Sequence, residues 1–139
     1  MKTKVIYKDF QINNVSFERV EFDDKEKYTR IYLDDVNEKR WVIKPIVEQA
    51  LKITTSDCVY YKKGDLAKEC FIKKENSFPL FQRHILEVED SKWIKELKRV
   101  LKKVDPFADY LEKSRHFILP LYDNQIELIA WDIVLEEIK

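Results

Sequence analysis

The C-terminal stretch from Arg115 to Ile138 constrains the fold more than any other part of this sequence, because it is the most apolar part. Two apolar runs, 117–122 and 126–135, flank Asp123-Asn124-Gln125, and Asp and Asn tolerate the left-handed backbone conformations of a tight turn. The second run is apolar on both sides of a period-two ladder, which is typical of a strand covered above and below. The sequence therefore predicts a C-terminal β-hairpin in the centre of a sheet.

Short strands separated by polar turns are predicted for the N-terminal half. Their β-branched and aromatic runs cover 4–12, 15–22, 28–33 and 40–44. Asn13-Asn14 is a turn signal, so the first two strands could pair as a hairpin. Pro45 denies one ladder hydrogen bond, which indicates a bend or an edge position before a further strand over 47–54, with a short helix over 45–51 as the alternative. Residues 57–76 fit either a hairpin or a loop followed by one helical turn.

An amphipathic helix over about 91–104 is the principal helix, and a strand over 81–88 precedes it. Asp90-Ser91 provides oxygens to cap the first amides, and apolar residues then recur at helical spacing opposite a charged face. We expect this helix to lie across the sheet with Trp93 and Leu97 inward. Asp105-Pro106 ends it and can start a short second helix over about 105–113.

These elements predict an α+β fold with a curved, mainly antiparallel sheet and its two helices packed on a face. No linker, low-complexity tract or repeat divides the 139 residues, so a single compact domain over 1–139 is expected. Because the last strand is apolar on both sides, a second layer or another subunit would cover the other face, which leaves a homodimer open.

Composition argues against several classes of function. The chain has 26 basic and 26 acidic residues, and this balance makes nucleic acid an unfavoured partner. Gly64 is the only glycine, which excludes a Walker loop and a dinucleotide fingerprint. No apolar run approaches the roughly 20 residues of a membrane span, and no signal peptide is evident, so we expect a cytoplasmic protein without a membrane partner. Cys58 and Cys70 are too few for a disulfide framework or a zinc site, and no cofactor or metal is expected.

The two histidines, His84 and His116, provide the candidate catalytic residues. If their strands were neighbours, they could meet with Asp123 or Glu127 in a metal or acid–base site. Ordinary histidines bonded to backbone are the alternative. Glu127 and Asp132 interrupt an apolar strand, so each carboxylate must reach solvent, a pocket or a cation such as Arg115 or Arg83.

Two further groups of side chains are candidates for binding. Paired carboxylates recur at Asp23-Asp24, Asp34-Asp35, Glu89-Asp90 and Glu136-Glu137, mostly in turns or caps that already explain them. The candidate binding residues are Asp23, Asp24, Asp34, Asp35, Tyr60 and Tyr61. Lys62-Lys63 and Lys73-Lys74, with aromatic residues between them, could contact phosphate, although interleaved acids favour a mixed solvated surface.

The C-terminal part resembles small uncharacterised bacterial proteins of α+β type. The resemblance rests on Val88-Glu89-Asp90-Ser91-Lys92-Trp93 at the start of the helix, on Arg115-His116-Phe117-Ile118, and on Asp123 leading into Ile126–Ala130. Such proteins include immunity proteins of toxin systems, so the resemblance implies a non-enzymatic interaction protein that binds and neutralises a toxin. The alternative is a small enzyme or ligand-binding domain with a pocket near His84, His116 and Glu127.

Overall fold

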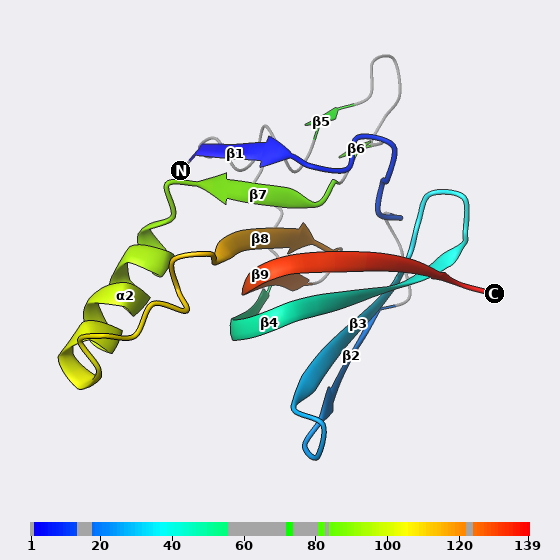
Figure 1. The fold of residues 1–139 in the computed structure, drawn as a ribbon. Helices are drawn as coiled ribbons and strands as arrows, with labels where there is room; N and C mark the ends of the chain where they lie inside the picture. Colours follow the sequence, from blue (N-terminus) through cyan, green and yellow to red (C-terminus); the bar gives the residue numbers. More distant parts are fainter. Residues whose placement is uncertain (1, 14–17, 56–71, 74–80, 83, 122–123) are drawn as a thin grey trace.

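The fold is that of a computed structural model, which describes residues 2–13, 18–55, 72–73, 81–82, 84–121 and 124–139. The predicted elements of 57–76 lie mostly outside these residues. The described elements are, in chain order, β1 (Lys2–Val5), β2 (Glu18–Asp23), β3 (Tyr28–Asp34), β4 (Arg40–Thr55), β5 (Ile72–Lys73), β6 (Phe81–Gln82), β7 (Leu86–Glu89), α2 (Lys92–Val104), β8 (Arg115–Pro120) and β9 (Asn124–Ile138) (Figure 1).

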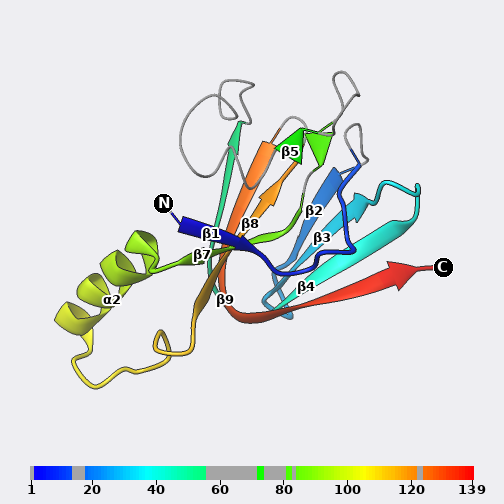
Figure 2. The same cartoon turned by 90° about the horizontal axis from the view of Figure 1, so that it is seen from above.

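A sheet of seven described strands dominates the molecule, in the order β1-β7-β8-β9-β4-β3-β2, and every neighbouring pair is antiparallel. The predicted α+β class with a mainly antiparallel sheet is therefore confirmed. β8 and β9 are neighbours, and β9 is the middle strand of the seven. The strands bend strongly along their length, most visibly β4 and β9 (Figure 2).

The main hydrophobic core lies on one face of this sheet. Ile31, Ile43, Phe117 and Leu128 point to that face from four strands, and the segment after β1 closes over them with Phe10 and Ile12. A smaller cluster of Leu86, Val88 and Ile118 lies on the opposite face. Both faces of the central strands are therefore buried, which is why β9 has no one-sided alternation of apolar and polar residues.

Strand pairing differs from the prediction at the N-terminus. The expected hairpin between 4–12 and 15–22 is wrong, because β1 pairs with β7 and β2 pairs with β3. β4 also runs unbroken through Pro45 to Thr55. The expected bend is present as a bulge just after Pro45, where Val47 adopts φ of 50° and the pairing with β9 shifts between Glu48 and Ala50.

The helical predictions were partly correct. α2 has the expected bounds, and Ser91 caps it by accepting the amide of Ile94 at 3.1 Å. The prediction of a second helix is wrong, because 105–113 forms separate turns. Each of their backbone hydrogen bonds joins an amide to the carbonyl three residues earlier, and these bonds do not continue into a helical series. Trp93 does face the sheet, where its ring meets His116 and Lys52, and Leu97 is half-buried, but α2 does not lie across the sheet and none of its residues is fully buried. The helix extends away from the sheet beyond the end of β7 (Figures 1 and 2).

Candidate functional site

A chain of three buried side chains joins the start of α2 to the middle of the sheet. Ser91 Oγ lies 2.7 Å from His116 Nδ1, and His116 Nε2 lies 2.8 Å from Glu127 Oε1. Ser91 follows β7, His116 is on β8, and Glu127 is on β9. In the register of β8 and β9, His116 is opposite Ile129 while Ile118 is opposite Glu127, so the histidine and the carboxylate are diagonal neighbours on one face.

The hydrogen bonds fix the direction of each donor. Glu127 as a carboxylate can only accept, so in the neutral ring of His116 the bare Nδ1 accepts the hydroxyl proton of Ser91, whose oxygen also accepts the amide N–H of Ile94. This pairing leaves the proton of the neutral ring on Nε2, where it donates to Glu127. The network therefore stabilises one tautomer of His116 and one orientation of its ring.

Lys52 and Trp93 surround the chain of hydrogen bonds. Lys52 is the cross-strand partner of Glu127 in the β4–β9 ladder, and its Nζ lies 3.2 Å from Glu127 Oε2. The same ammonium is 4.7 Å from the centre of the Trp93 ring, which also meets the His116 ring edge to face at 5.4 Å. Burial alone would raise the pKa of Glu127, but the hydrogen bond from His116 and the charge of Lys52 outweigh it and lower that pKa.

An open cleft of about 290 Å³ lies beside Ser91 and His116, between α2 and the ends of β7 and β8. Its charged lining residues are paired. Arg115 bonds to both oxygens of Glu87 and to Asp132, and Lys95 pairs with Asp90. The predicted ion pair between Asp132 and Arg115 is therefore confirmed.

His84 does not belong to this chain of side chains. It is buried, and its Nδ1 is 3.1 Å from the carbonyl oxygen of Phe10, so it is an ordinary histidine bonded to backbone. The structure thus brings together two of the three predicted catalytic candidates, His116 and Glu127, and adds Ser91 and Lys52. The sequence indicated Ser91 only as a helix cap, and nothing in it indicated Lys52.

Ser91, His116 and Glu127 have the composition of a nucleophile, a base and an orienting carboxylate. Two features oppose nucleophilic chemistry. The Ser91 oxygen uses one lone pair to cap α2, and Lys52 already balances the charge of Glu127 that would otherwise stabilise a protonated His116. Since both Ser91 and His116 are also buried, the arrangement is better suited to attaching α2 to the sheet.

The predicted acidic binding residues have different environments. Asp35 is buried and accepts the amides of Asn37 and Lys39 and the indole N–H of Trp41. Asp34 pairs with Arg40 at 3.0 Å. These two residues therefore stabilise the β3–β4 turn, and Asp35 is not available to a partner.

Asp23 and Asp24 lie in the exposed β2–β3 turn. Asp23 Oδ1 accepts the amides of Lys25 and Glu26, and Asp24 pairs with Lys27 at 3.2 Å. The predicted binding residues Tyr60 and Tyr61, and most of the lysine-rich segment 62–74, lie outside the described residues.

The fold and site together define an α+β protein with an antiparallel sheet and a buried Ser–His–Glu chain. No protein-family model, curated protein or solved structure matches this chain. In the described part of the chain, no group of three His, Cys, Asp or Glu residues is arranged to hold a metal ion. No helix of that part is long and apolar enough to cross a bilayer.

Proposed function

We propose that the chain is a non-enzymatic protein-interaction module of the cytoplasm that binds its partner through the β2–β3 hairpin. One observation carries the proposal: Phe22 is 62% exposed on a strand between Glu21 and Asp23. Aromatic residues, phenylalanine among them, are enriched at the cores of protein interfaces, where a few anchor side chains carry most of the binding energy.

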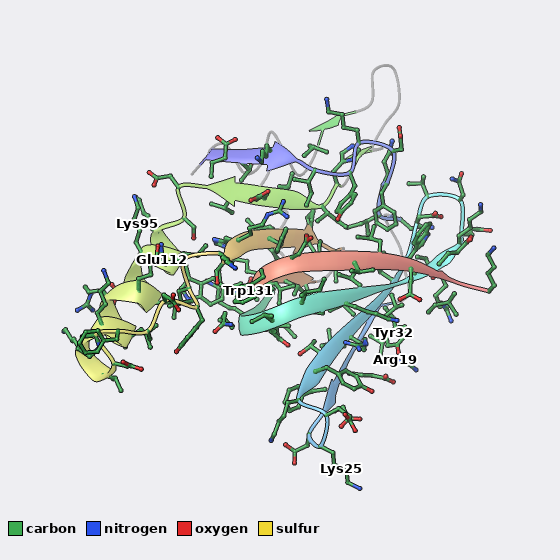
Figure 3. The ribbon with its side chains drawn as sticks, viewed as in Figure 1. Arg19, Lys25, Tyr32, Lys95, Glu112 and Trp131 are labelled. Atoms are coloured by element: carbon green, nitrogen blue, oxygen red, sulfur yellow. The ribbon has the colours of Figure 1, made fainter. Side chains whose placement is uncertain are left out.

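The hairpin presents Phe22 away from the body of the sheet. β3 pairs with β4 only from Ile31 to Asp34, so the outer part of the hairpin has no described strand on its other side. It projects from the sheet in Figure 1, and Lys25 marks its tip in Figure 3. A cleft of about 350 Å³, lined by Glu21, Phe22, Asp23 and Tyr28, lies beside the exposed ring.

The conformation of the hairpin is already fixed. Besides the two amides bonded to the Asp23 side chain, the amide of Lys27 donates to the Asp23 carbonyl at 2.8 Å. Arg19 stacks on Tyr32 at 4.5 Å (Figure 3), and Arg30 stacks on Tyr28 at 3.9 Å. A surface that is ordered before binding loses less conformational entropy in the complex, which favours affinity.

Charge identifies the kind of partner. Residues 18–28 contain five acidic and three basic side chains, and Asp24 and Glu26 are exposed at the tip. A complementary surface would offer an apolar pocket for Phe22 surrounded by Lys or Arg. This agrees with the expected binding role of Asp23 and Asp24, with Asp23 acting by shaping the turn.

Affinity capture with the full-length chain tests the proposal. Wild type, Phe22→Ala and Phe107→Ala would serve as baits in the cells that express the protein, the last as a matched control because Phe107 is an exposed phenylalanine elsewhere. We expect wild type and the control to retain one partner, and Phe22→Ala to bind the purified partner at least about 30-fold more weakly. Equal capture by all three baits would contradict the proposal.

The specific form of this proposal is an immunity-type inhibitor of a bacterial toxin, and its support is the resemblance of the C-terminal part. Co-expression with a toxin encoded by an adjacent gene provides the test. We expect rescue of growth by wild type and loss of rescue by Phe22→Ala. Absence of both rescue and co-purification would exclude the toxin as partner while leaving the hairpin proposal to the capture experiment.

A second candidate function, hydrolysis by a serine nucleophile, is favoured by the 2.7 Å contact between Ser91 Oγ and His116 Nδ1. Covalent labelling with a fluorophosphonate probe would distinguish it, with Ser114→Ala as control because Ser114 lines the same cleft. Labelling that disappears in Ser91→Ala and persists in Ser114→Ala would support an enzyme. We expect no labelling, because the Ser91 hydroxyl is buried and caps α2.

A further inference from the structure

The 13 residues of α2 separate completely into a basic face and an apolar face. The charged face consists of Lys92, Lys95, Glu96, Lys98, Arg99, Lys102 and Lys103. The apolar face consists of Trp93, Ile94, Leu97, Val100, Leu101 and Val104. At 100° per residue, Glu96 and Lys98 lie nearest the two borders of the apolar face, and Lys103 lies next beyond Glu96.

The sheet covers the apolar face only at its start, where the Trp93 ring packs on His116 and Lys52. No residue of α2 is fully buried, and towards its end Val100 is 48% and Val104 81% exposed. Figures 1 and 2 show the helix extending beyond the sheet from the end of β7. A surface helix of a globular protein normally buries its apolar stripe against the core, so the exposed part of this stripe is available to a binding partner.

The returning segment 105–114 is attached to both the sheet and α2. It is held by the indole N–H of Trp131, which donates to the Tyr110 carbonyl at 2.8 Å, and by an ion pair between Lys98 and Glu112 at 3.2 Å. Figure 3 labels Trp131 and Glu112 on this side of the helix. Phe107, at the turn, is 94% exposed and extends the apolar surface beyond Val104.

We infer that α2 and the turn at Phe107 bind the surface of a lipid bilayer that contains anionic lipid. An interfacial helix has an apolar face of Trp, Phe and Leu type that enters the headgroup boundary, and a polar face rich in Lys. Lys98 is paired with Glu112, but Lys103 forms no ion pair within the described residues, so its ammonium group can reach lipid phosphates while its stem covers apolar surface. Peripheral binding differs from the expectation of no membrane partner, which rested on the lack of a membrane span.

The distribution of charge on α2 favours an anionic bilayer over two other partners, a second copy of the chain and an acidic protein groove. A second copy docking through the apolar faces would leave the six cations of each α2 without a compensating anionic surface, whereas an anionic bilayer supplies one. The apolar residues that a protein groove would hold, Val104 and Phe107, lie at one end of α2. The carboxylates of an acidic groove would lie near them, whereas the cations extend over the whole length of α2 from Lys92 to Lys103. Within the described residues Lys92, Lys102 and Lys103 form no ion pair, so they are available to an extended anionic surface.

Vesicle co-sedimentation with the full-length chain tests the inference. The probes are vesicles of phosphatidylcholine alone and vesicles of equal parts phosphatidylcholine and phosphatidylglycerol. The variants are Lys102→Glu/Lys103→Glu, Phe107→Ala, and Lys8→Glu/Lys25→Glu as a control with the same change of charge at exposed lysines elsewhere. Circular dichroism confirms that each variant is folded, which is expected because all five residues are exposed.

We expect wild type to bind only the anionic vesicles, and more weakly as salt rises. Loss of Lys102 and Lys103 should weaken binding at least about 30-fold, and loss of the Phe107 ring about tenfold or more, with the control variant close to wild type. Absence of binding to the anionic vesicles would overturn the inference, as would equal losses in the control. Capture of an acidic protein through these residues without vesicle binding would assign the surface to that protein and also overturn it.

Discussion

Removal of the Ser91 hydroxyl is the perturbation that most directly tests how α2 is attached. The hydroxyl has two roles: it caps the helix through the amide of Ile94, and it donates to the buried Nδ1 of His116. Ser91→Ala removes both roles. Ser91→Gly removes the bond to His116 but retains most of the capping, because glycine is nearly as good a cap as serine.

The expected losses in the free energy of unfolding differ enough between the two variants to be measured. Loss of a serine cap to alanine costs about 1 kcal/mol, and an unpaired buried nitrogen costs about 1 to 3 kcal/mol. Ser91→Ala should therefore lower the free energy of unfolding by about 2 to 4 kcal/mol, and Ser91→Gly by about 1 kcal/mol less than that. The cost of the unpaired nitrogen would be smaller if water entered the cleft beside His116 and bonded to it.

Urea unfolding followed by circular dichroism, with a double-mutant cycle between Ser91→Ala and His116→Leu, provides the assay. We expect the two single losses to be non-additive by about 1 kcal/mol or more, because the side chains are in contact. The attachment mechanism would be refuted if Ser91→Ala and Ser91→Gly each changed stability by less than about 0.5 kcal/mol, or if the cycle were additive.

Three further predictions concern other parts of the chain. Glu127→Gln should be less stable than wild type at neutral pH. Because the pKa of Glu127 is lowered in the folded state, the ionised carboxylate stabilises the fold at pH values above its unfolded pKa. The difference in stability between wild type and Glu127→Gln should therefore shrink as acid titrates the folded carboxylate. A pH-independent difference in urea unfolding would contradict this. Asp35→Asn places an amide N–H₂ against the indole N–H of Trp41 or against two backbone amides, so we expect a loss of about 1.5 to 3 kcal/mol in the same assay. Phe107→Ser should leave the free energy of unfolding unchanged within about 0.5 kcal/mol; a larger loss would show that the ring packs against the protein.

The sequence predicted the type and bounds of α2 well because both depend on local chemistry. The cap at Ser91 and the helical spacing of apolar residues are present within the segment itself. The same spacing cannot show what covers the apolar face, since segregation of residues around a helix does not report tertiary contact. The wrong prediction that α2 lies across the sheet followed from assuming that an apolar face is always fully buried, although Trp93 at its start does pack on His116.

Strand pairing and the site were harder to predict for a common reason. β1 pairs with β7, and Lys52 meets Glu127, across more than 70 residues of chain, and no local pattern specifies such a register. His116 and Glu127 were singled out because polar residues on apolar strands need partners. Their partner Ser91 could be recognised as a cap but not as a donor to His116, because that contact depends on where α2 leaves the sheet.

A net charge of zero says little about the partners of this chain, because its charges are segregated. The β2–β3 hairpin carries an excess of acid at one edge of the sheet order, while α2 carries six cations and one carboxylate after β7, near the other edge. Electrostatic attraction depends on the local potential within about a Debye length, roughly 10 Å at 0.1 M salt, so the two surfaces act independently. Phe22→Ala should therefore weaken protein capture without affecting vesicle binding, and Phe107→Ala should do the reverse. A variant that reduced both would mean that the two surfaces are coupled or that the fold is damaged, and unfolding measurements on the same variant would distinguish these explanations.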